Sequence, residues 1–265
     1  MFRRIFRKKT LIKILAFYIF IVVFMYIFQR NFLYYPFGKI LIIPEDFQEI
    51  NLKTVDNTSI YGWYSPPQKG QKTILYFHGN AGNLMGRSDR FEKFATQYGV
   101  LAISYRGYAK SKGEPSQDGF YQDAESAYEF LKAKNILSKD IILFGESIGS
   151  AVAVNLASKH DFGALILEAP FSSIKSIAQK SYWFLPVSLI LKDRFEVDKV
   201  APIVTAPVLI MHANKDYIVP FEEGKKLYEL FNSRKKFIAI DGDFHIALTG
   251  DYLMKQILEF LQEKK

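Results

Sequence analysis

Ser147 has the sequence context of a catalytic nucleophile. It is the middle residue of Gly-Glu-Ser-Ile-Gly at residues 145–149, between an apolar run at 141–144 that predicts a strand and a stretch at 150–159 that predicts a helix. A serine hydroxyl attacks a carbonyl carbon only when a base can reach it and the backbone holds it exposed. The flanking glycines lack the Cβ atoms that would clash in so tight a turn. This predicts a nucleophile elbow, although the five-residue pattern alone also fits an ordinary turn.

A serine nucleophile needs a base, and histidine most often serves as one. The chain has four histidines, His78, His160, His212 and His245. In chains with a nucleophile elbow the order is serine, acid, histidine. His245 follows the last predicted strand in the loop Asp-Gly-Asp-Phe-His, and we predict that it is the base. His160 ends a predicted helix and is interpreted as a solvated residue. His212 closes a predicted strand and is interpreted as a structural hydrogen-bonding residue, with the role of base as the alternative.

The acid that orients the imidazole should follow the strand before the last one. Asp216 does so, in the loop that follows the predicted strand at 208–211. The other aspartates weighed are interpreted as turn or surface charges, with Asp243 kept as an alternative acid: Asp193, Asp198, Asp241 and Asp243.

A loop of small residues follows the predicted strand at 73–77 and has the sequence His-Gly-Asn-Ala-Gly-Asn at 78–83. Such a loop can direct a backbone N–H toward the negative charge that develops on a carbonyl oxygen. We predict an oxyanion hole with Asn80 as the first donor and Ile148, just after the nucleophile, as the second. His78 is interpreted as a residue that braces this loop. A glycine-rich turn can also bind phosphate, but this one lacks the spacing of a dinucleotide-binding loop and the Lys-Ser/Thr of a P-loop.

The elements that must position these residues alternate along the chain. Two alternating runs, at 49–55 and 60–65, predict a hairpin. Strands are then predicted at 73–77, 100–104, 141–144, 164–167, 208–211 and 236–240, and helices at 87–98, 119–135, 151–158, 222–231 and 252–261. Continuous apolar strands separated by helices indicate an α/β protein whose mostly parallel central sheet has helices on both faces. In such a sheet the site lies beyond the carboxyl ends of the strands. The stretch 171–200 is too long for a simple crossover, so we predict a short cap insertion over the site.

An apolar segment at 10–28 precedes the predicted domain. As a helix it would be about 28 Å long, against a bilayer hydrocarbon core of about 30 Å. Lys13 lies near one end, where its charge can reach the headgroups. A cleaved secretory signal has a similar pattern, but no small-x-small cleavage site follows, so we favour an uncleaved signal anchor. The predicted organisation is a basic tail and transmembrane anchor at 1–30, a juxtamembrane segment at 31–48 and a catalytic domain at 49–265.

Most of the net charge lies in the tail. The first 28 residues carry six basic residues and no acid, out of a formal net charge of +8. The rest of the chain is nearly neutral, which argues against a nucleic-acid-binding face. Basic residues before the span place the amino terminus in the cytoplasm and the domain on the outer side of the membrane, in the periplasm if the source is a bacterium. Aromatic residues after the span fit either an interfacial belt or packing under the first strands: Phe32, Tyr34, Tyr35 and Phe37.

As a set, these residues resemble the α/β-hydrolase superfamily, and within it a branch of membrane-anchored serine hydrolases. The resemblance runs from Glu49 to the end of the chain and rests on the motifs at 78–83, 105–108, 111–116 and 145–149, the Asp216 loop and His245. The branch is similar to esterases, lysophospholipases, peptidase-like hydrolases and protein depalmitoylases. It implies transfer of an acyl group to water through an acyl-enzyme on Ser147, without a metal or an organic cofactor.

The expected partners are the membrane and a small-molecule or lipid acyl ester or thioester. The apolar run 182–191 lies in the predicted cap, and we predict that Tyr182, Trp183, Phe184 and Leu185 contact the acyl chain. The alternative is that this run only packs the cap onto the domain. Two other functions stay open: a peptidase or amidase with the same triad, and a catalytically silent, membrane-tethered binding protein.

Overall fold

The computed structural model describes residues 2–38, 42–246 and 248–263. Parts of the predicted juxtamembrane segment, at 39–41, and of the predicted catalytic domain, at 247 and 264–265, lie outside the described residues, as does Met1. The side chains of the basic tail up to residue 7 lie outside them as well.

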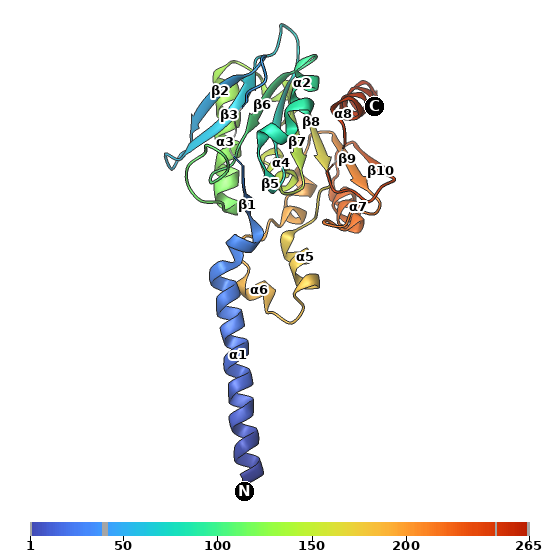
Figure 1. Ribbon diagram of the computed structural model, residues 1–265. Coiled ribbons are helices and arrows are strands. Elements are labelled where there is room, and N and C mark those ends of the chain that lie inside the picture. The colour runs from blue at the N-terminus through green and yellow to red at the C-terminus, as the bar shows by residue number, and fades with distance from the viewer. Residues whose placement is uncertain (1, 39–41, 247, 264–265) are drawn as a thin grey trace.

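The described part of the chain forms a central sheet of eight strands, ordered β10-β9-β8-β7-β4-β6-β3-β2 (Figure 1). The strands are β2 (Gln48–Lys53), β3 (Ser59–Ser65), β4 (Thr73–Phe77), β6 (Gly99–Ile103), β7 (Ile141–Glu146), β8 (Ala164–Glu168), β9 (Val208–Ala213) and β10 (Lys235–Ile240). From β10 to β6 all neighbours are parallel, while β2 and β3 form the predicted antiparallel hairpin at one edge. Residues in β4, β6, β7 and β8 are buried throughout because both faces of the sheet are covered.

Helices cover the two faces of the sheet. They are α2 (Ser88–Ala95), α3 (Gln117–Ala133), α4 (Ile148–Ala157), α7 (Phe221–Leu230) and α8 (Gly250–Gln262). Apolar residues of α3, α4 and α7 belong to one core cluster, and those of α2 and α8 to a second. In β4 successive side chains alternate between them, with Leu75 in the first cluster and Tyr76 in the second, as the pleat of a strand requires. The predicted mostly parallel sheet with helices on both faces is therefore confirmed.

The predicted insertion is a small cap between β8 and β9. It contains α5 (Ile174–Ser181), α6 (Val187–Ile190) and the 3₁₀ turns η3 (Val197–Lys199) and η4 (Ala201–Ile203). Ser173 caps α5 by accepting a hydrogen bond from the Ser176 amide at 3.0 Å. Two other 3₁₀ turns, η1 (Leu84–Arg87) and η2 (Ser138–Asp140), lie outside the cap.

The amino-terminal helix α1 (Phe2–Leu33) projects away from the domain, and α6 lies beside its carboxyl half (Figure 1). Residues Lys8–Leu33 are long and apolar enough to cross a membrane, with a mean hydropathy of 2.6, although a signal sequence has the same features. After α1 the chain forms β1 (Tyr35–Pro36), which pairs in parallel with β5 (Ala81–Gly82) in the predicted oxyanion loop.

The aromatic residues after the span were expected either to form an interfacial belt or to pack under the first strands, and they do not all behave alike. Tyr34 is buried and packs edge-on against Phe120, with ring centroids 5.2 Å apart. Phe32, Tyr35 and Phe37 remain exposed. Tyr34 therefore packs against the domain, and only the other three are free to form an interfacial belt.

Candidate active site

Ser147 lies at the turn between β7 and α4. Its φ of 51° and ψ of −119° are rare for a residue with a side chain. The glycines two residues away permit this packing, because a Cβ on Gly149 would lie 2.2 Å from the Phe77 carbonyl oxygen and one on Gly145 would lie 2.5 Å from the Gly149 carbonyl oxygen. The sequence therefore folds here into the predicted strand, sharp turn and helix.

The imidazole of His245 lies between Ser147 and Asp216. His245 Nε2 is 2.9 Å from Ser147 Oγ, and His245 Nδ1 is 2.7 Å from Asp216 Oδ2. A proton on Nδ1 satisfies both contacts, because Nδ1 then donates to the carboxylate and Nε2 accepts from the hydroxyl. Asp216 follows β9 and His245 follows β10, so all three side chains meet at the carboxyl edge of the sheet.

The carboxylate of Asp216 is held on every side. Its side chain is completely covered, and its Oδ1 accepts hydrogen bonds from the amides of Ile218 (2.8 Å) and Val219 (2.9 Å). Burial raises the pKa of Asp216, but hydrogen bonds from His212, His245 and the Val219 amide outweigh it and hold the pKa well below its usual range. Asp216 therefore stays ionised and can stabilise a positively charged imidazolium.

The two predicted oxyanion donors lie beside Ser147. Asn80 and Ile148 line the same cavity as Ser147, and within the described ranges neither backbone amide has a hydrogen-bond partner. The neighbouring Gly79 amide cannot serve, because it donates to Glu146 Oε1 at 2.6 Å. The Asn80 side chain is fixed between the Tyr108 hydroxyl (2.9 Å) and the Leu33 carbonyl (2.5 Å). Both amides are thus free to donate a hydrogen bond to a ligand in this cavity.

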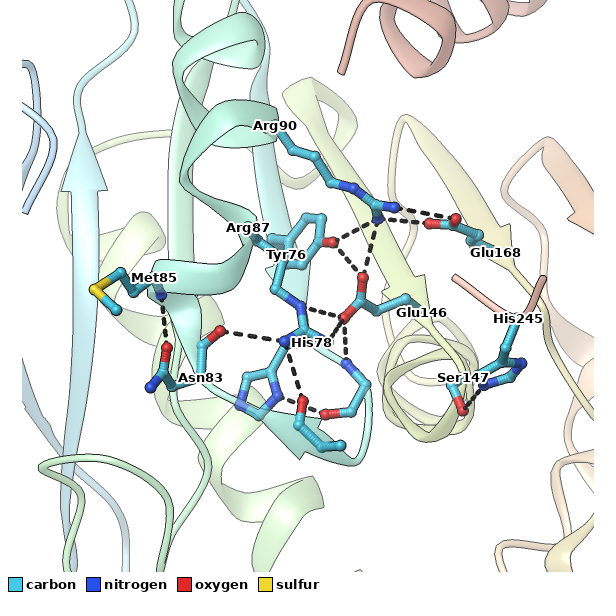
Figure 2. Close-up of polar contacts among 12 residues, drawn as sticks. Tyr76, His78, Asn83, Met85, Arg87, Arg90, Glu146, Ser147, Glu168 and His245 are labelled. Atoms are coloured by element: carbon cyan, nitrogen blue, oxygen red, sulfur yellow. Dashed lines mark hydrogen bonds and ion pairs between the residues drawn. The ribbon is translucent and has the colours of Figure 1, made fainter. Parts of the chain in front are cut away.

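Glu146, the variable residue before the nucleophile, is the centre of a buried ion-pair network that sequence reasoning missed (Figure 2). Its Oε1 accepts from Arg87 Nε at 2.7 Å, and its Oε2 accepts from Tyr76 Oη (2.7 Å) and Arg90 Nη1 (3.0 Å). Arg90 also pairs with Glu168 at 2.6 Å. Burial raises the pKa of Glu146, but the two guanidinium groups outweigh it and hold the pKa at about 2. The network ties β7, α2 and β8 together beneath the elbow and the oxyanion loop.

A cavity of about 420 Å³ opens from Ser147 toward α1 and the cap. Its walls include the predicted contacts Tyr182 and Leu185, but Trp183 and Phe184 do not line it. Trp183 is 82% exposed, because the chain turns between α5 and α6 and directs this side chain away from the cavity. Of the four residues predicted to contact the acyl chain, only Tyr182 and Leu185 therefore belong to the wall of this cavity.

Four residues of α1 also form cavity wall, which the sequence did not indicate: Met25, Gln29, Phe32 and Leu33. The helix is fixed to the cap by a bidentate ion pair in which Arg30 Nε lies 2.7 Å from Asp193 Oδ2. Gln29 donates to the Ile190 carbonyl (3.0 Å) and accepts from the Lys192 amide (2.7 Å). Asp193, interpreted from the sequence as a surface or turn charge, is thus a buried tie between α1 and the cap.

The other histidines lie outside this arrangement. His78 is buried with its ring 4.5 Å from that of Tyr105, and its Nδ1 donates to the Gly79 carbonyl at 2.7 Å, which fits its predicted bracing role. Burial, with Arg87 nearby, lowers its pKa to about 4. His212 is buried with Nε2 3.3 Å from Asp216 Oδ2 and 3.1 Å from the Val219 carbonyl, which fits its structural role. His160 pairs with Glu125 at 2.8 Å. No group of three or more metal-ligating side chains occurs among the residues described.

The remaining aspartates also lie apart from the imidazole of His245. Asp241 is exposed and accepts from Asn214 Nδ2 at 3.0 Å, and Asp243 is exposed. The amide of Asp198 donates to the Ser172 carbonyl at 3.0 Å, inside the cap. Of the acids considered, Asp216 is the one that contacts His245.

Known proteins are similar to this chain in sequence. A family model described as serine aminopeptidase, S33, matches residues 68–195. YfhR of Escherichia coli K12 is 31% identical, with 96% of this chain and 95% of that protein covered. The protein bem46 of Schizosaccharomyces pombe is 34% identical, with 91% and 88% covered. Rv2307c of Mycobacterium tuberculosis is 31% identical, with 92% and 90% covered.

Two solved structures show the same fold at low sequence identity. The esterase Pf2001 of Pyrococcus furiosus superposes with a TM-score of 0.71 at 21% identity, covering 86% of this chain and 98% of that one. Est1E of Butyrivibrio proteoclasticus, solved with ferulic acid bound, superposes with a TM-score of 0.67 at 19% identity, covering 80% and 97%. The predicted α/β-hydrolase fold is confirmed.

Proposed function

Because this chain belongs to the α/β-hydrolase family that includes YfhR and bem46, we propose that it is a membrane-anchored serine hydrolase that cleaves carboxylic esters or thioesters of lipid-like acyl groups. The observation that carries this proposal is the continuous hydrogen-bonded series Ser147, His245 and Asp216, which opens onto an apolar cavity.

The proposed reaction begins at Ser147. As Oγ forms a bond to the acyl carbon, its proton passes to His245 Nε2, and Asp216 stabilises the imidazolium. The tetrahedral intermediate then collapses, and Nε2 returns the proton to the departing alcohol or thiol. A water molecule next gives a proton to Nε2 and attacks the acyl-enzyme, which releases the carboxylic acid and restores the serine. The first proton transfer uses the 2.9 Å contact between Nε2 and Oγ, and the 2.7 Å contact of Nδ1 with Asp216 orients the imidazole in every step.

The free amides of Asn80 and Ile148 support the proposed oxyanion hole. A preorganised N–H donor is worth about 10²- to 10³-fold in kcat in comparable enzymes. The proposed contribution of Asn80 is made by its backbone, and its side-chain bonds to Tyr108 and Leu33 hold that backbone in place. Because Leu33 ends α1, the anchor itself supports one of the two donors.

The cavity supports a long neutral acyl group as substrate. Along the parts of the chain that the structure describes, none of the residues lining it is Asp, Glu, Lys or Arg. An apolar wall without an ionised partner favours a hydrocarbon chain over a charged group, which would lose its hydration there without compensation.

A peptidase is the second candidate, because the matching family model is described as a serine aminopeptidase. An aminopeptidase must bind the ammonium group of its substrate, and a carboxylate would normally pair with it. The absence of an acidic residue among the described cavity-lining residues argues for the ester over the aminoacyl amide. Measuring turnover of aminoacyl amides beside acyl esters distinguishes the two.

The contacts of α1 support an uncleaved anchor over a signal peptide. Removing the helix would take away Met25, Gln29, Phe32 and Leu33 from the cavity wall and would leave Asp193 buried without Arg30. The basic residues before the span support a cytoplasmic amino terminus and an outward-facing domain. Protease added outside intact cells or spheroplasts should digest the domain, and complete protection would reverse this orientation.

A fluorophosphonate probe tests the proposed nucleophile, because it reacts with activated serines. We expect labelling of the full-length protein in detergent and its loss in Ser147→Ala. Ser158→Ala, at the other end of α4, is the matched control and should be labelled like the wild type. A correctly folded wild-type protein that takes no label would instead support the catalytically silent binding protein.

A further inference from the structure

The turn between α5 and α6 exposes apolar side chains that its own domain does not cover. Trp183 and Leu189 are each 82% exposed, and Tyr182 and Phe184 are about half exposed. The whole stretch 182–191 contains no charged residue, and lysines stand at 180 and 192, just before and after it. Exposed aromatic and aliphatic side chains in an uncharged run, with basic residues on either side, are typical of a protein surface that binds a membrane.

The same turn contacts α1 near the middle of the helix. Tyr18 Oη donates to the Phe184 carbonyl oxygen at 2.9 Å. Tyr18 lies ten residues before Phe28, which corresponds to about 15 Å along a helix. Half of a bilayer hydrocarbon core is also about 15 Å. If α1 spans a bilayer, its contact with Phe184 therefore lies well inside the hydrocarbon region.

Polar contacts fix the height of the cap along α1. The Arg30–Asp193 ion pair and the Gln29 hydrogen bonds lie at the end of the span nearest the domain. At the same level, Lys192 Nζ lies 4.2 Å from the ring centroid of Tyr26. Charges and aromatic rings are favourable at the headgroup level. The cap is thus attached with its polar end at the proposed interface and its apolar turn below it.

Most backbone groups of the turn are also satisfied locally, as hydrocarbon demands. Amides at 182, 185, 187, 189, 190 and 191 donate to carbonyls between 178 and 187, and residue 186 is a proline with no amide hydrogen. Tyr18 supplies the Phe184 carbonyl with a donor from α1. The surface of this segment therefore consists mainly of side chains, and few of its backbone groups lack a hydrogen-bond partner.

We propose that the cap segment 182–191 is embedded in the bilayer leaflet that surrounds the carboxyl half of α1, and that the cavity receives its acyl chain laterally from that leaflet. The second half of this inference rests on the proposed hydrolase function, and the first half does not. The cavity wall is built from α1 and the cap together, including Met25 and Phe32 from the helix and Leu185 and Ile190 from the cap. An acyl chain would pass from lipid to Ser147 between two elements that both lie in the leaflet.

Tryptophan fluorescence tests the embedding without any hydrolysis. The chain has two tryptophans, and Trp63 is completely buried in β3, so the difference between wild type and Trp183→Phe reports Trp183 alone. In full-length protein reconstituted into phosphatidylcholine vesicles, we expect that difference signal to be blue-shifted. We expect strong quenching by phosphatidylcholine carrying a doxyl group on its acyl chain, and iodide quenching several-fold weaker than for free tryptophan. A red-shifted signal that iodide quenches and doxyl lipid does not would overturn the embedding.

An activity comparison tests lateral entry. Leu189→Asp places a charge on the exposed face of α6 outside the cavity lining. Leu137→Asp is a matched control at an exposed leucine just before the amino-terminal end of β7, whereas Ser147 follows the carboxyl end of that strand. With p-nitrophenyl palmitate in vesicles, Leu189→Asp should lose at least about ten-fold in turnover, because a carboxylate within the hydrocarbon is costly. It should retain turnover of soluble p-nitrophenyl acetate, and Leu137→Asp should retain both.

The outcomes of that comparison separate the two proposals. Equal turnover of the vesicle substrate by Leu189→Asp and wild type would overturn lateral entry while the hydrolase assignment stands. Wild-type protein that cleaves neither ester would overturn the hydrolase assignment, and the Trp183 measurement would still decide the embedding.

Discussion

Replacing Asp216 with asparagine should disable the proposed base without removing it. Asp216 Oδ1 accepts two backbone amides, from Ile218 and Val219, so the single oxygen of an asparagine must occupy that position. Its amide nitrogen then faces His245 Nδ1, where the carboxylate oxygen lies 2.7 Å away in the native protein. Nδ1 must now accept the hydrogen bond, which moves the imidazole proton to Nε2.

This tautomer cannot take a proton from Ser147, because Nε2 already carries one. The same exchange in a serine protease triad lowers kcat about 10⁴-fold, which corresponds to about 5 kcal/mol of transition-state stabilisation. We therefore expect Asp216→Asn to lose about 10⁴-fold in kcat on a p-nitrophenyl ester at neutral pH, with KM little changed. Asp243→Asn, an exposed aspartate two residues before His245, is the matched control and should keep wild-type kinetics. An Asp216→Asn enzyme within ten-fold of wild type would refute this reasoning.

Three further predictions concern the surroundings of the site. Glu146→Gln should destabilise the protein by about 3–5 kcal/mol in urea unfolding, because it leaves Arg87 without its buried counterion and Arg90 with Glu168 alone. Since the pKa of Glu146 is held at about 2, below its usual 4.5, its contribution is complete above about pH 4.5 and is lost as pH falls toward 2. The unfolding free energy of wild type should therefore drop more steeply across that range than that of Glu146→Gln. Asn80→Ala retains the amide donor but loses its side-chain bonds, so kcat should fall by about ten-fold while KM changes little. Arg30→Ala leaves the Asp193 carboxylate buried and unpaired, which should loosen the cap and reduce turnover of octanoate esters more than that of acetate esters; equal losses on both would contradict this.

The strands could be predicted from the sequence because a strand that is buried on both faces of the sheet is a continuous apolar run. The continuous apolar runs at 73–77 and 141–144 became β4 and the first part of β7. Turn chemistry was equally informative, since the glycines at 145 and 149 stand where a Cβ would clash. Chain order then sufficed to choose His245 and Asp216 from several histidines and aspartates, and the structure brings both to Ser147.

Contacts between distant segments were beyond that reasoning. Arg30 and Asp193 are 163 residues apart, and nothing in the sequence around either residue indicates that the two form an ion pair. Glu146 occupies a position that the motif leaves open. Its four partners come from β4, the loop after it, η1 and α2, and they meet Glu146 only when these elements pack against β7. In the cap, hydrophobicity alone could not distinguish a side chain facing the cavity, such as Leu185, from one facing outward, such as Trp183.

The most direct test of the central claim is to find the acyl group on the enzyme. Full-length protein in detergent is mixed with an excess of p-nitrophenyl octanoate, and the reaction is quenched with acid within the first turnover. The protein is then digested, and its peptides are mapped by mass spectrometry. We predict an octanoyl adduct on Ser147 in wild type, and none on that peptide in Ser147→Ala. An adduct on another residue, or p-nitrophenol release by Ser147→Ala at the wild-type rate, would contradict the account.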